Sequence, residues 1–305
     1  LTGSITGKDR EKNNFDFENN FIHHLSSPLP YRREKNQTVE NFCNELVKEF
    51  EQKIEELGAE NVAAFIAEPV LASGGCIVPP DGYFKKIYDV CKKNQIIFIA
   101  DEVVTGFGRL GHFFSSEEIF GVVPDIITCA KGITSGYLPL GAVLFSNKLV
   151  SDLKDNSSLF FHGYTYSGHP ACCAAALKNI EILKRDKILE HVKEIGPYFF
   201  EKLNSLYELP IVGDIRGKGL MAGIECVINK DSKEALVLDK AIGSRIDEES
   251  IKLGLIIRPL YHICVLSPAL IINKEQINEL TEKLYQAISN TIEQLKNEGL
   301  WSQTK

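Results

Sequence analysis

The stretch IIFIADEVVTGFGR, residues 96–109, decides the fold class. Its first five residues, Ile96 to Ala100, are all apolar, as in a strand that is buried on both faces of a parallel sheet. The run ends at two adjacent carboxylates, Asp101 and Glu102. In open parallel sheets, ligands bind beyond the carboxyl ends of the strands, because the loops there form a crevice. The acidic pair is therefore a first candidate for a functional site.

The segments on either side of this strand continue the alternation of strand and helix. VAAFIAEP (62–69) has the composition of a buried strand, and DGYFKKIYDVCKK (81–93) has that of a helix. DIITCAK (125–131) and GAVLFS (141–146) are predicted to be further strands. A strand, a helix and a second apolar strand in this order form a parallel βαβ unit. The pattern predicts an α/β fold with a mainly parallel, doubly wound sheet.

The chain divides into two predicted domains near residue 180. Residues 1–180 form the large α/β domain, which starts with an irregular segment followed by an amphipathic helix over 41–57. Residues 181–305 form a smaller α+β domain. Its last helix begins at Asn273, where an Asn273…Gln276 capping box is predicted. The strands predicted for this domain lie within residues 211–227, 254–260 and 262–272.

Composition and charge exclude several classes of protein. The 305 residues are 44% hydrophobic and 25% charged, which is ordinary for a globular protein. A net charge of −7 without a basic run argues against nucleic acid as a partner. No apolar stretch approaches the ~20 residues that span a bilayer, so neither a membrane nor a secretory route is expected. The eight cysteines lack zinc or disulfide spacing, so we expect a cytoplasmic protein without a metal site.

The start of the chain is unusual. The first residue is Leu1, and Met221 is the only methionine. We therefore expect that the N-terminal part of the large domain is missing from this sequence.

Three charged residues lie at the ends of predicted strands, each after an apolar run: Glu68, Asp101 and Lys131. A nucleoside triphosphatase could use such a carboxylate to hold Mg²⁺, but it also needs GxxxxGK[ST]. The nearest segment, GSITGKD (3–9), has only three residues between its glycines and carries Asp9 in place of the hydroxyl residue. Pyridoxal-phosphate (PLP) chemistry needs a lysine for covalent attachment and a carboxylate that keeps the pyridine nitrogen protonated. Asp101 and Lys131 supply that pair.

Several segments resemble the class III aminotransferases, and within that family they resemble most the ω-amino acid:pyruvate branch. The similar segments are AFIAEPV (64–70), ADEVVTGFGRLG (100–111), PDIITCAKGITSGYLPLGAV (124–143) and HGYTYSGHPACCAAAL (162–177). A weaker similarity continues through GDIRGKGLMAGIE (213–225) and IIRPLYHICVLSPALII (256–272). The resemblance implies the PLP-transferase fold type I, with a mainly parallel large domain and a smaller α+β domain.

The resemblance also implies roles for five residues in cofactor binding. Lys131 would hold PLP covalently and, once released by the incoming amine, would carry the proton between substrate and cofactor. Asp101 would pair with the pyridinium, and Glu102 would turn toward the loop. Val103 would pack on the ring, although simple core filling explains it nearly as well. Thr165 would reach the cofactor phosphate of the neighbouring subunit of a homodimer, and Glu68 would support the site or form a structural ion pair.

Arg258 resembles the arginine that binds substrate carboxylates in the ω-branch, since a guanidinium fork matches a carboxylate. The ornithine and γ-aminobutyrate branches carry glutamate where this chain has Ser73, and glutamine where it has Val104. Both departures argue against those branches. Arg109 is expected to anchor the loop after Asp101.

The leading hypothesis is a PLP-dependent transaminase that moves an amino group from an amine or ω-amino acid to a 2-oxo acid such as pyruvate. Alternatives within the family are the diaminopelargonate-forming transaminase of biotin synthesis and an aminomutase. From another class, the chain could be an inactive truncated remnant that serves as a binding or dimerisation module. By the resemblance, the turn that binds the PLP phosphate and the aromatic residue that stacks on the ring precede Leu1. The fragment itself is therefore expected to bind PLP poorly or not at all.

Overall fold

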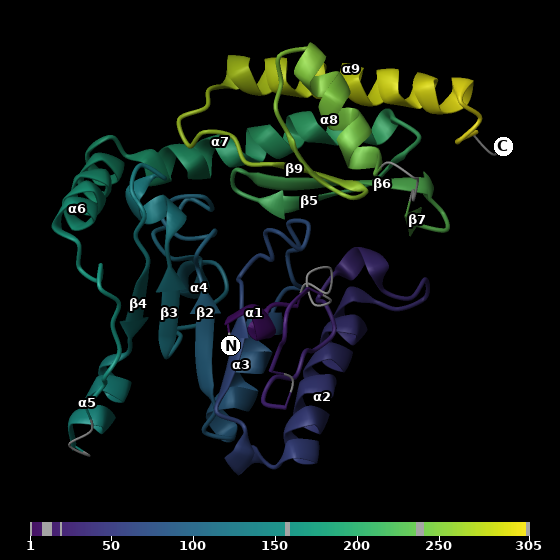
Figure 1. Cartoon of the computed structure of the whole chain (residues 1–305). Helices are drawn as coiled ribbons and strands as arrows, with labels where there is room; N and C mark the ends of the chain where they lie inside the picture. Colours follow the sequence, from purple (N-terminus) through teal and green to yellow (C-terminus); the bar gives the residue numbers. More distant parts are fainter. Residues whose placement is uncertain (1, 8–13, 19, 156–158, 236–240, 303–305) are drawn as a thin grey trace.

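The computed structural model describes residues 2–7, 14–18, 20–155, 159–235 and 241–302. Two tiers of secondary structure lie one above the other (Figure 1). The lower tier holds the first sheet with α2 (Val39–Leu57) and α3 (Tyr83–Lys93), and the upper tier holds the second sheet with three long helices. α6 (Pro170–Arg185) lies at the side of the molecule, and the chain passes along it from the lower tier to the upper.

The lower sheet has the strand order β1-β2-β3-β4. β1, β2 and β3 are parallel, whereas β4 pairs antiparallel with β3 at the edge. The four strands are β1 (Ala64–Ala67), β2 (Ile97–Asp101), β3 (Ile126–Cys129) and β4 (Ala142–Phe145). All four predicted strands are therefore present, and the predicted mainly parallel sheet is confirmed.

One face of this sheet is covered by α2 and α3. Thr38 begins α2 by accepting a hydrogen bond from the Asn41 backbone N–H, as N-cap residues do. Buried apolar side chains from the two helices pack against Phe65 and Phe98 of the strands, and the rings of these two phenylalanines lie 5.5 Å apart. Because alternate side chains of a strand point to opposite faces, the residues next to Phe65 and Phe98 point to the other face.

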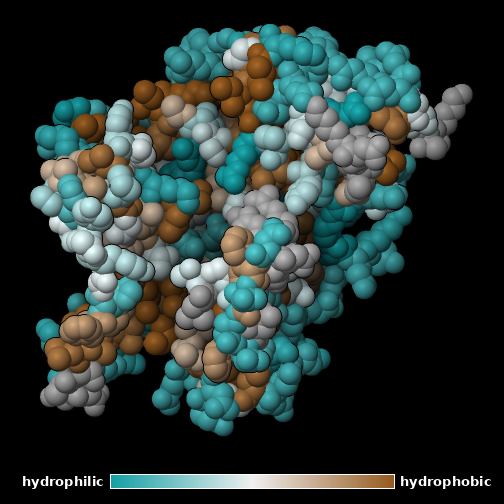
Figure 2. All heavy atoms as spheres, viewed as in Figure 1, coloured by the Kyte–Doolittle hydropathy of each residue, from teal (hydrophilic) through white to brown (hydrophobic). Residues whose placement is uncertain are grey.

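That other face is open. Ile66 of β1 is 39% exposed, and Val143 and Phe145 of β4 are 53% and 36% exposed. Figure 2 shows brown, apolar atoms over β3 and β4, between α5 (Asn147–Asp155) and the N-terminal segment. Asp101 and Thr128 lie at one end of this open face, because they are in register with each other and follow the same alternation.

The upper tier contains a mostly antiparallel sheet with the order β5-β6-β9-β8, and β7 pairs with β6. Its helices bury one continuous core against β6 and β9. The last helix has the predicted capping box between Asn273 and Gln276. The elements are β5 (Val212–Lys218), β6 (Met221–Asn229), β7 (Glu234–Ala235), β8 (Arg258–Leu260), β9 (Ile263–Leu266), α7 (Ile188–Leu203), α8 (Ile242–Lys252) and α9 (Lys274–Asn297).

Several helices of the structure are not predicted by the sequence patterns. α7 buries Ile188, Val192, Ile195, Phe199 and Leu203 at helical spacing, but Gly196-Pro197 interrupts the pattern as a helix end would. The other missed helices are short or lack a clear apolar face: α1 (Thr2–Ile5), α4 (Ser115–Glu118), α5, α8 and the 3-10 segments η2 (Pro30–Arg32), η3 (Ala59–Asn61), η4 (Lys131–Thr134) and η5 (Asn204–Glu208).

The predicted domain boundary near residue 180 falls within α6 and remains a proposal. Within the described ranges, none of the helices combines the length and apolar character that crossing a bilayer requires. All eight cysteines are free thiols, and seven of them are buried.

Candidate active site

The three charged residues that follow predicted strands lie at the same edge of the lower sheet. Asp101 is the last residue of β2 and is in register with Thr128 of β3. Glu68 directly follows β1, which runs parallel to β2. Lys131 follows the end of β3. The carboxyl ends of parallel strands thus bring two carboxylates and an amine to one edge, as the sequence predicts.

The sequence predicts that Lys131 ends a strand. In the structure, Lys131 instead begins the 3-10 segment η4, with a left-handed φ of 41°. The following Gly132 fits because a Cβ there would lie 2.9 Å from the Cβ of Phe107 and 3.1 Å from the carbonyl oxygen of Gly106. The close approach turns the chain at the lysine. Lys131 is exposed, and within the described part of the chain no carboxylate forms an ion pair with its amine. The amine is available to a ligand.

Asp101 is half-buried, and both of its hydrogen bonds reach the same carboxylate oxygen. The backbone N–H of Val103 donates to Oδ1 over 3.0 Å, and the hydroxyl of Thr128 donates to Oδ1 over 3.2 Å. Val103 lies in the turn after β2 and not on the strand itself, because β2 ends at Asp101. The sequence analysis did not single out Thr128, since its role depends on the pairing register of two strands.

Glu102 points into the protein and is fully buried. Its carboxylate accepts hydrogen bonds from the backbone N–H groups of Ser115 and Ser116, each over 2.7 Å, and from three hydroxyl groups. The hydroxyl donors are Thr105, Ser115 and Ser116. The expectation that Glu102 turns toward the loop is confirmed. The adjacent acids therefore differ: Asp101 lies at the end of the open face of the sheet, and Glu102 binds Thr105 and the start of α4 inside the protein.

Glu68 closes the loop that follows β1. Its Oε2 accepts a hydrogen bond from the Ala72 backbone N–H over 3.1 Å. Leu71 and Ile77 then pair across this loop. Glu68 therefore links the end of β1 to the start of the 71–77 loop.

Arg109 joins the two tiers. Its Nη1 donates to the carbonyl of Leu220 over 3.0 Å and to that of Pro268 over 2.6 Å. Burial lowers the pKa of Arg109 to about 10, so the guanidinium stays charged at neutral pH. The expectation that Arg109 anchors the loop is confirmed, and its partners lie in the upper tier.

Arg258 begins β8 and is exposed. It occupies one row of the upper sheet with Val265, Gly223 and Arg216, since each is in register with the next. The 71–77 loop rests on this row: a Cβ on Gly223 would lie 2.6 Å from the carbonyl oxygen of Gly75. A glycine is required there by this close approach. This row of residues therefore links the 71–77 loop to β8, the strand that begins with Arg258.

The charged residues around the 71–77 loop change the pKa of the buried Cys76 thiol. Burial is the main cause that raises the pKa of this thiol to about 12; the charges of Arg216, Arg258 and Arg109 oppose the shift, and that of Glu68 adds to it. Glu68 and Arg258 therefore both act on the same buried residue. Arg258 is linked to this loop only through the strand register, because Val265 pairs with both Arg258 and Gly223, and Gly223 meets Gly75; within the described ranges, no hydrogen bond joins Arg258 to Asp101 or Lys131.

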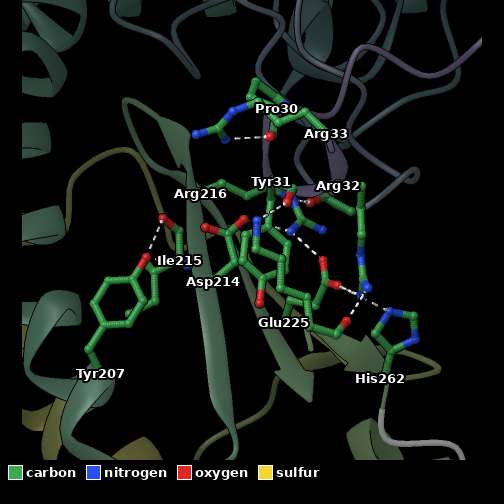
Figure 3. Close-up of polar contacts among 12 residues, drawn as sticks. Pro30, Tyr31, Arg32, Arg33, Tyr207, Asp214, Ile215, Arg216, Glu225 and His262 are labelled. Carbon is green, nitrogen blue, oxygen red and sulfur yellow. Dashed lines mark hydrogen bonds and ion pairs between the residues drawn. The ribbon is translucent and has the colours of Figure 1, made fainter. Parts of the chain in front are cut away.

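A buried charge cluster fixes this part of the upper sheet (Figure 3). Glu225 is 1% exposed and binds Arg216 Nη1 over 2.5 Å, with Arg32 and His262 on its other oxygen. Arg216 also binds Asp214 over 2.9 Å and donates to the carbonyl of Gly75 over 2.8 Å. Burial alone would raise the pKa of Glu225, but His262, Arg216 and Arg32 outweigh it and lower the pKa to about 2. The sequence analysis missed this cluster, because its members are far apart in the chain.

Thr165 lies in the exposed segment between β4 and α6. Its neighbours form a turn in which the Ser167 N–H donates to the carbonyl of Tyr164 over 3.0 Å. Among the described residues, Thr165 makes no hydrogen bond to Asp101 or Lys131. The predicted role of Thr165 requires a second subunit and stays a prediction.

Comparison with known proteins decides the family. The family model for Aminotransferase class-III matches residues 2–288. The chain belongs to the class III aminotransferases. The putrescine–pyruvate aminotransferase of Pseudomonas aeruginosa is 43% identical over 266 residues, which are 87% of this chain and 58% of that protein. The chloroplastic γ-aminobutyrate transaminase 3 of Solanum lycopersicum is 38% identical over 98% of this chain and 58% of its own length.

Solved class III aminotransferases have the same fold. The (S)-enantioselective ω-transaminase of Thermomicrobium roseum superposes with a TM-score of 0.90 at 41% identity, over 95% of this chain and 65% of that one. The aminotransferase of Vibrio fluvialis in its PMP-bound form has a TM-score of 0.91 at 35% identity, over 96% and 65% of the two chains. The predicted fold type I is confirmed. The chain spans somewhat more than half the length of the curated relatives it matches.

The residues present fit PLP, the cofactor of this class III family. A half-buried carboxylate with one oxygen already satisfied and an exposed primary amine lie at neighbouring strand ends, which are the two groups that PLP chemistry requires. In the described part of the chain, no three His, Cys, Asp or Glu side chains gather in a way that could hold a metal ion. Residues 8 and 9 of the GSITGKD segment lie outside the described residues.

Proposed function

We propose that this protein is a PLP-dependent transaminase that moves an amino group from an amine or ω-amino acid to a 2-oxo acid such as pyruvate. The observation that carries the proposal is the arrangement of Asp101 and Lys131 at the ends of the neighbouring strands β2 and β3. Membership of the class III aminotransferases supports the same reaction. An inactive remnant would have no physical need for both groups at one edge.

The residues of the proposed site have different roles. When bound, PLP supplies an electron sink for the substrate carbon. Lys131 holds the cofactor and accepts and returns a proton at Nζ, for which its exposed amine is suited. Asp101 keeps the pyridine nitrogen protonated, Val103 packs against the ring, and Glu68 holds the 71–77 loop in position.

The substrates follow from Arg258 and from the names of the relatives. An exposed guanidinium at the start of β8 can bind the carboxylate of a 2-oxo acid bidentately. The Pseudomonas aeruginosa relative is named for putrescine and pyruvate, and several plant relatives are named for γ-aminobutyrate. Ser73 and Val104 argue against the ornithine and γ-aminobutyrate branches, but the names of the plant relatives keep γ-aminobutyrate among the donors to be assayed.

The proposed assembly is a homodimer with a shared active site. Thr165 would reach the phosphate of the cofactor held by the partner subunit. Support comes from the apolar side chains around it, since Phe161 is 99% exposed and Tyr164 and Tyr166 are 77% and 80% exposed. Sedimentation equilibrium of the wild type and of a Phe161→Ser variant tests this arrangement, and a monomeric wild type would contradict it.

The proposed location is the cytoplasm. Eight free cysteines, most of them buried, agree with a reducing compartment. No nucleic acid or membrane partner is proposed, in line with a net charge of −7.

Reductive trapping tests the proposed function. The purified chain is mixed with PLP and reduced with borohydride, and the pyridoxyl group is located by peptide mass spectrometry. The expected label lies on Lys131 and is lost in Lys131→Ala. Asp101→Ala should weaken it strongly. Lys178, an exposed lysine of α6, provides the matched control Lys178→Ala, which should leave the label on Lys131 unchanged. Labels scattered over surface lysines would contradict the proposed site.

A further inference from the structure

The carboxylate of Asp101 is oriented by two donors on one of its oxygens. Oδ1 accepts hydrogen bonds from the Val103 backbone N–H over 3.0 Å and from the Thr128 hydroxyl over 3.2 Å. Within the described ranges, Oδ2 accepts no hydrogen bond and Asp101 forms no ion pair. Oδ1 of Asp101 is therefore held by hydrogen bonds within the protein, and Oδ2 is left to bind a ligand.

We propose that Thr128 is a positioning residue that orients Asp101 toward the pyridine nitrogen of the cofactor. This inference rests on the proposed function. Thr128 lies directly beside Asp101 in the parallel pairing of β2 and β3, on the open face of the sheet. Cross-strand neighbours on one face are close enough for their side chains to interact.

The chemistry of Thr128 suits this task. A β-branched side chain has few χ1 rotamers, so a threonine loses little conformational freedom when its hydroxyl binds Asp101. The second donor is the backbone N–H of Val103, which a side-chain substitution there does not remove. Thr128 is thus the one donor to Asp101 whose side chain can be replaced while the backbone and the other hydrogen bond remain.

The test uses Thr128→Val, which keeps the shape and removes the hydroxyl, and Thr128→Ser, which restores a hydroxyl. Thr291→Val is the matched control, because Thr291 is buried in α9 and its hydroxyl donates to the Ala287 carbonyl in the upper tier. The first readout is the carboxyl-carbon NMR resonance of Asp101 in the chain without cofactor, assigned by its loss in Asp101→Asn. The second is the dissociation constant for PLP, measured by absorbance titration.

Thr128→Val should move the Asp101 resonance and weaken PLP binding about tenfold, as expected for the loss of a hydrogen bond to a charged group. Thr128→Ser should return both readouts close to the wild type, and Thr291→Val should change neither. An unmoved Asp101 resonance in Thr128→Val would overturn the inference. Because borohydride also traps weakly bound PLP, a wild type without a pyridoxyl label on Lys131 would overturn the proposed function, whereas the NMR readout needs no cofactor and still tests whether Thr128 orients Asp101. Unchanged PLP affinity in Thr128→Val, with a wild type that binds, overturns this inference alone.

Discussion

Replacing Glu225 with glutamine should destabilise the protein by about 3 kcal/mol at pH 7. Glu225 is 1% exposed and binds Arg216, Arg32 and His262. Its pKa falls from an ordinary 4.5 to about 2, and a difference of this size at about 1.4 kcal/mol per pH unit corresponds to roughly 3 kcal/mol. Glutamine keeps the shape but leaves the buried Arg216 short of negative charge.

The sign of the pH dependence follows from the lowered pKa. The contribution of Glu225 is fully present above pH 4.5 and is lost as the pH falls from 4.5 toward 2, because protonation breaks the ion pairs. Urea unfolding of the wild type and of Glu225→Gln at pH 6 and pH 3 measures the difference, which should shrink by about 2 kcal/mol. Glu234→Gln, at an exposed position of β7, is the matched control and should stay within about 0.5 kcal/mol of the wild type.

Two results would refute this reasoning. Equal unfolding free energies of wild type and Glu225→Gln at pH 7 would mean that the burial cost of the carboxylate cancels its ion pairs. A difference that stays constant down to pH 3 would mean that packing, and not charge, stabilises the cluster.

Three further predictions follow from named contacts. Glu102→Gln should lower the unfolding free energy by about 2 kcal/mol or more in urea, because the carboxylate is fully buried among donors only; an unchanged midpoint would contradict this. Arg258→Ala should raise the KM for pyruvate about 10- to 100-fold and leave the KM for an amine without a carboxylate near that of the wild type. Asn273→Ala should cost about 1 kcal/mol by removing the capping box of α9, whereas Asn297→Ala, at an exposed position at the other end of the same helix, serves as control; equal losses would argue against the cap.

The strands of the lower sheet could be read from the sequence because a parallel sheet buries apolar runs. VAAFIAEP, IIFIAD and GAVLFS each became a strand, and Glu68, Asp101 and Lys131 lie where β1, β2 and β3 end, at one edge of the sheet. The end of the DIITCAK strand was placed too late, because β3 ends at Cys129 and Lys131 already begins η4, where Gly132 packs closely against Gly106 and Phe107. α7 escaped prediction because Gly196-Pro197 resembles a break, although tertiary packing keeps the helix continuous.

Local patterns in the sequence alone determined the fold class, the capping box of α9, and Asp101 and Lys131 as the candidate pair. Only the tertiary structure decided which side chains meet across strands. The Thr128 hydroxyl reaches Asp101, and Glu225 gathers Arg216 and Arg32, which lies 193 residues away in the chain. The physical reason is that apolar periodicity and capping are properties of consecutive residues. Hydrogen bonds and ion pairs between segments depend on pairing register and on the packing of one tier against the other, which no local pattern encodes.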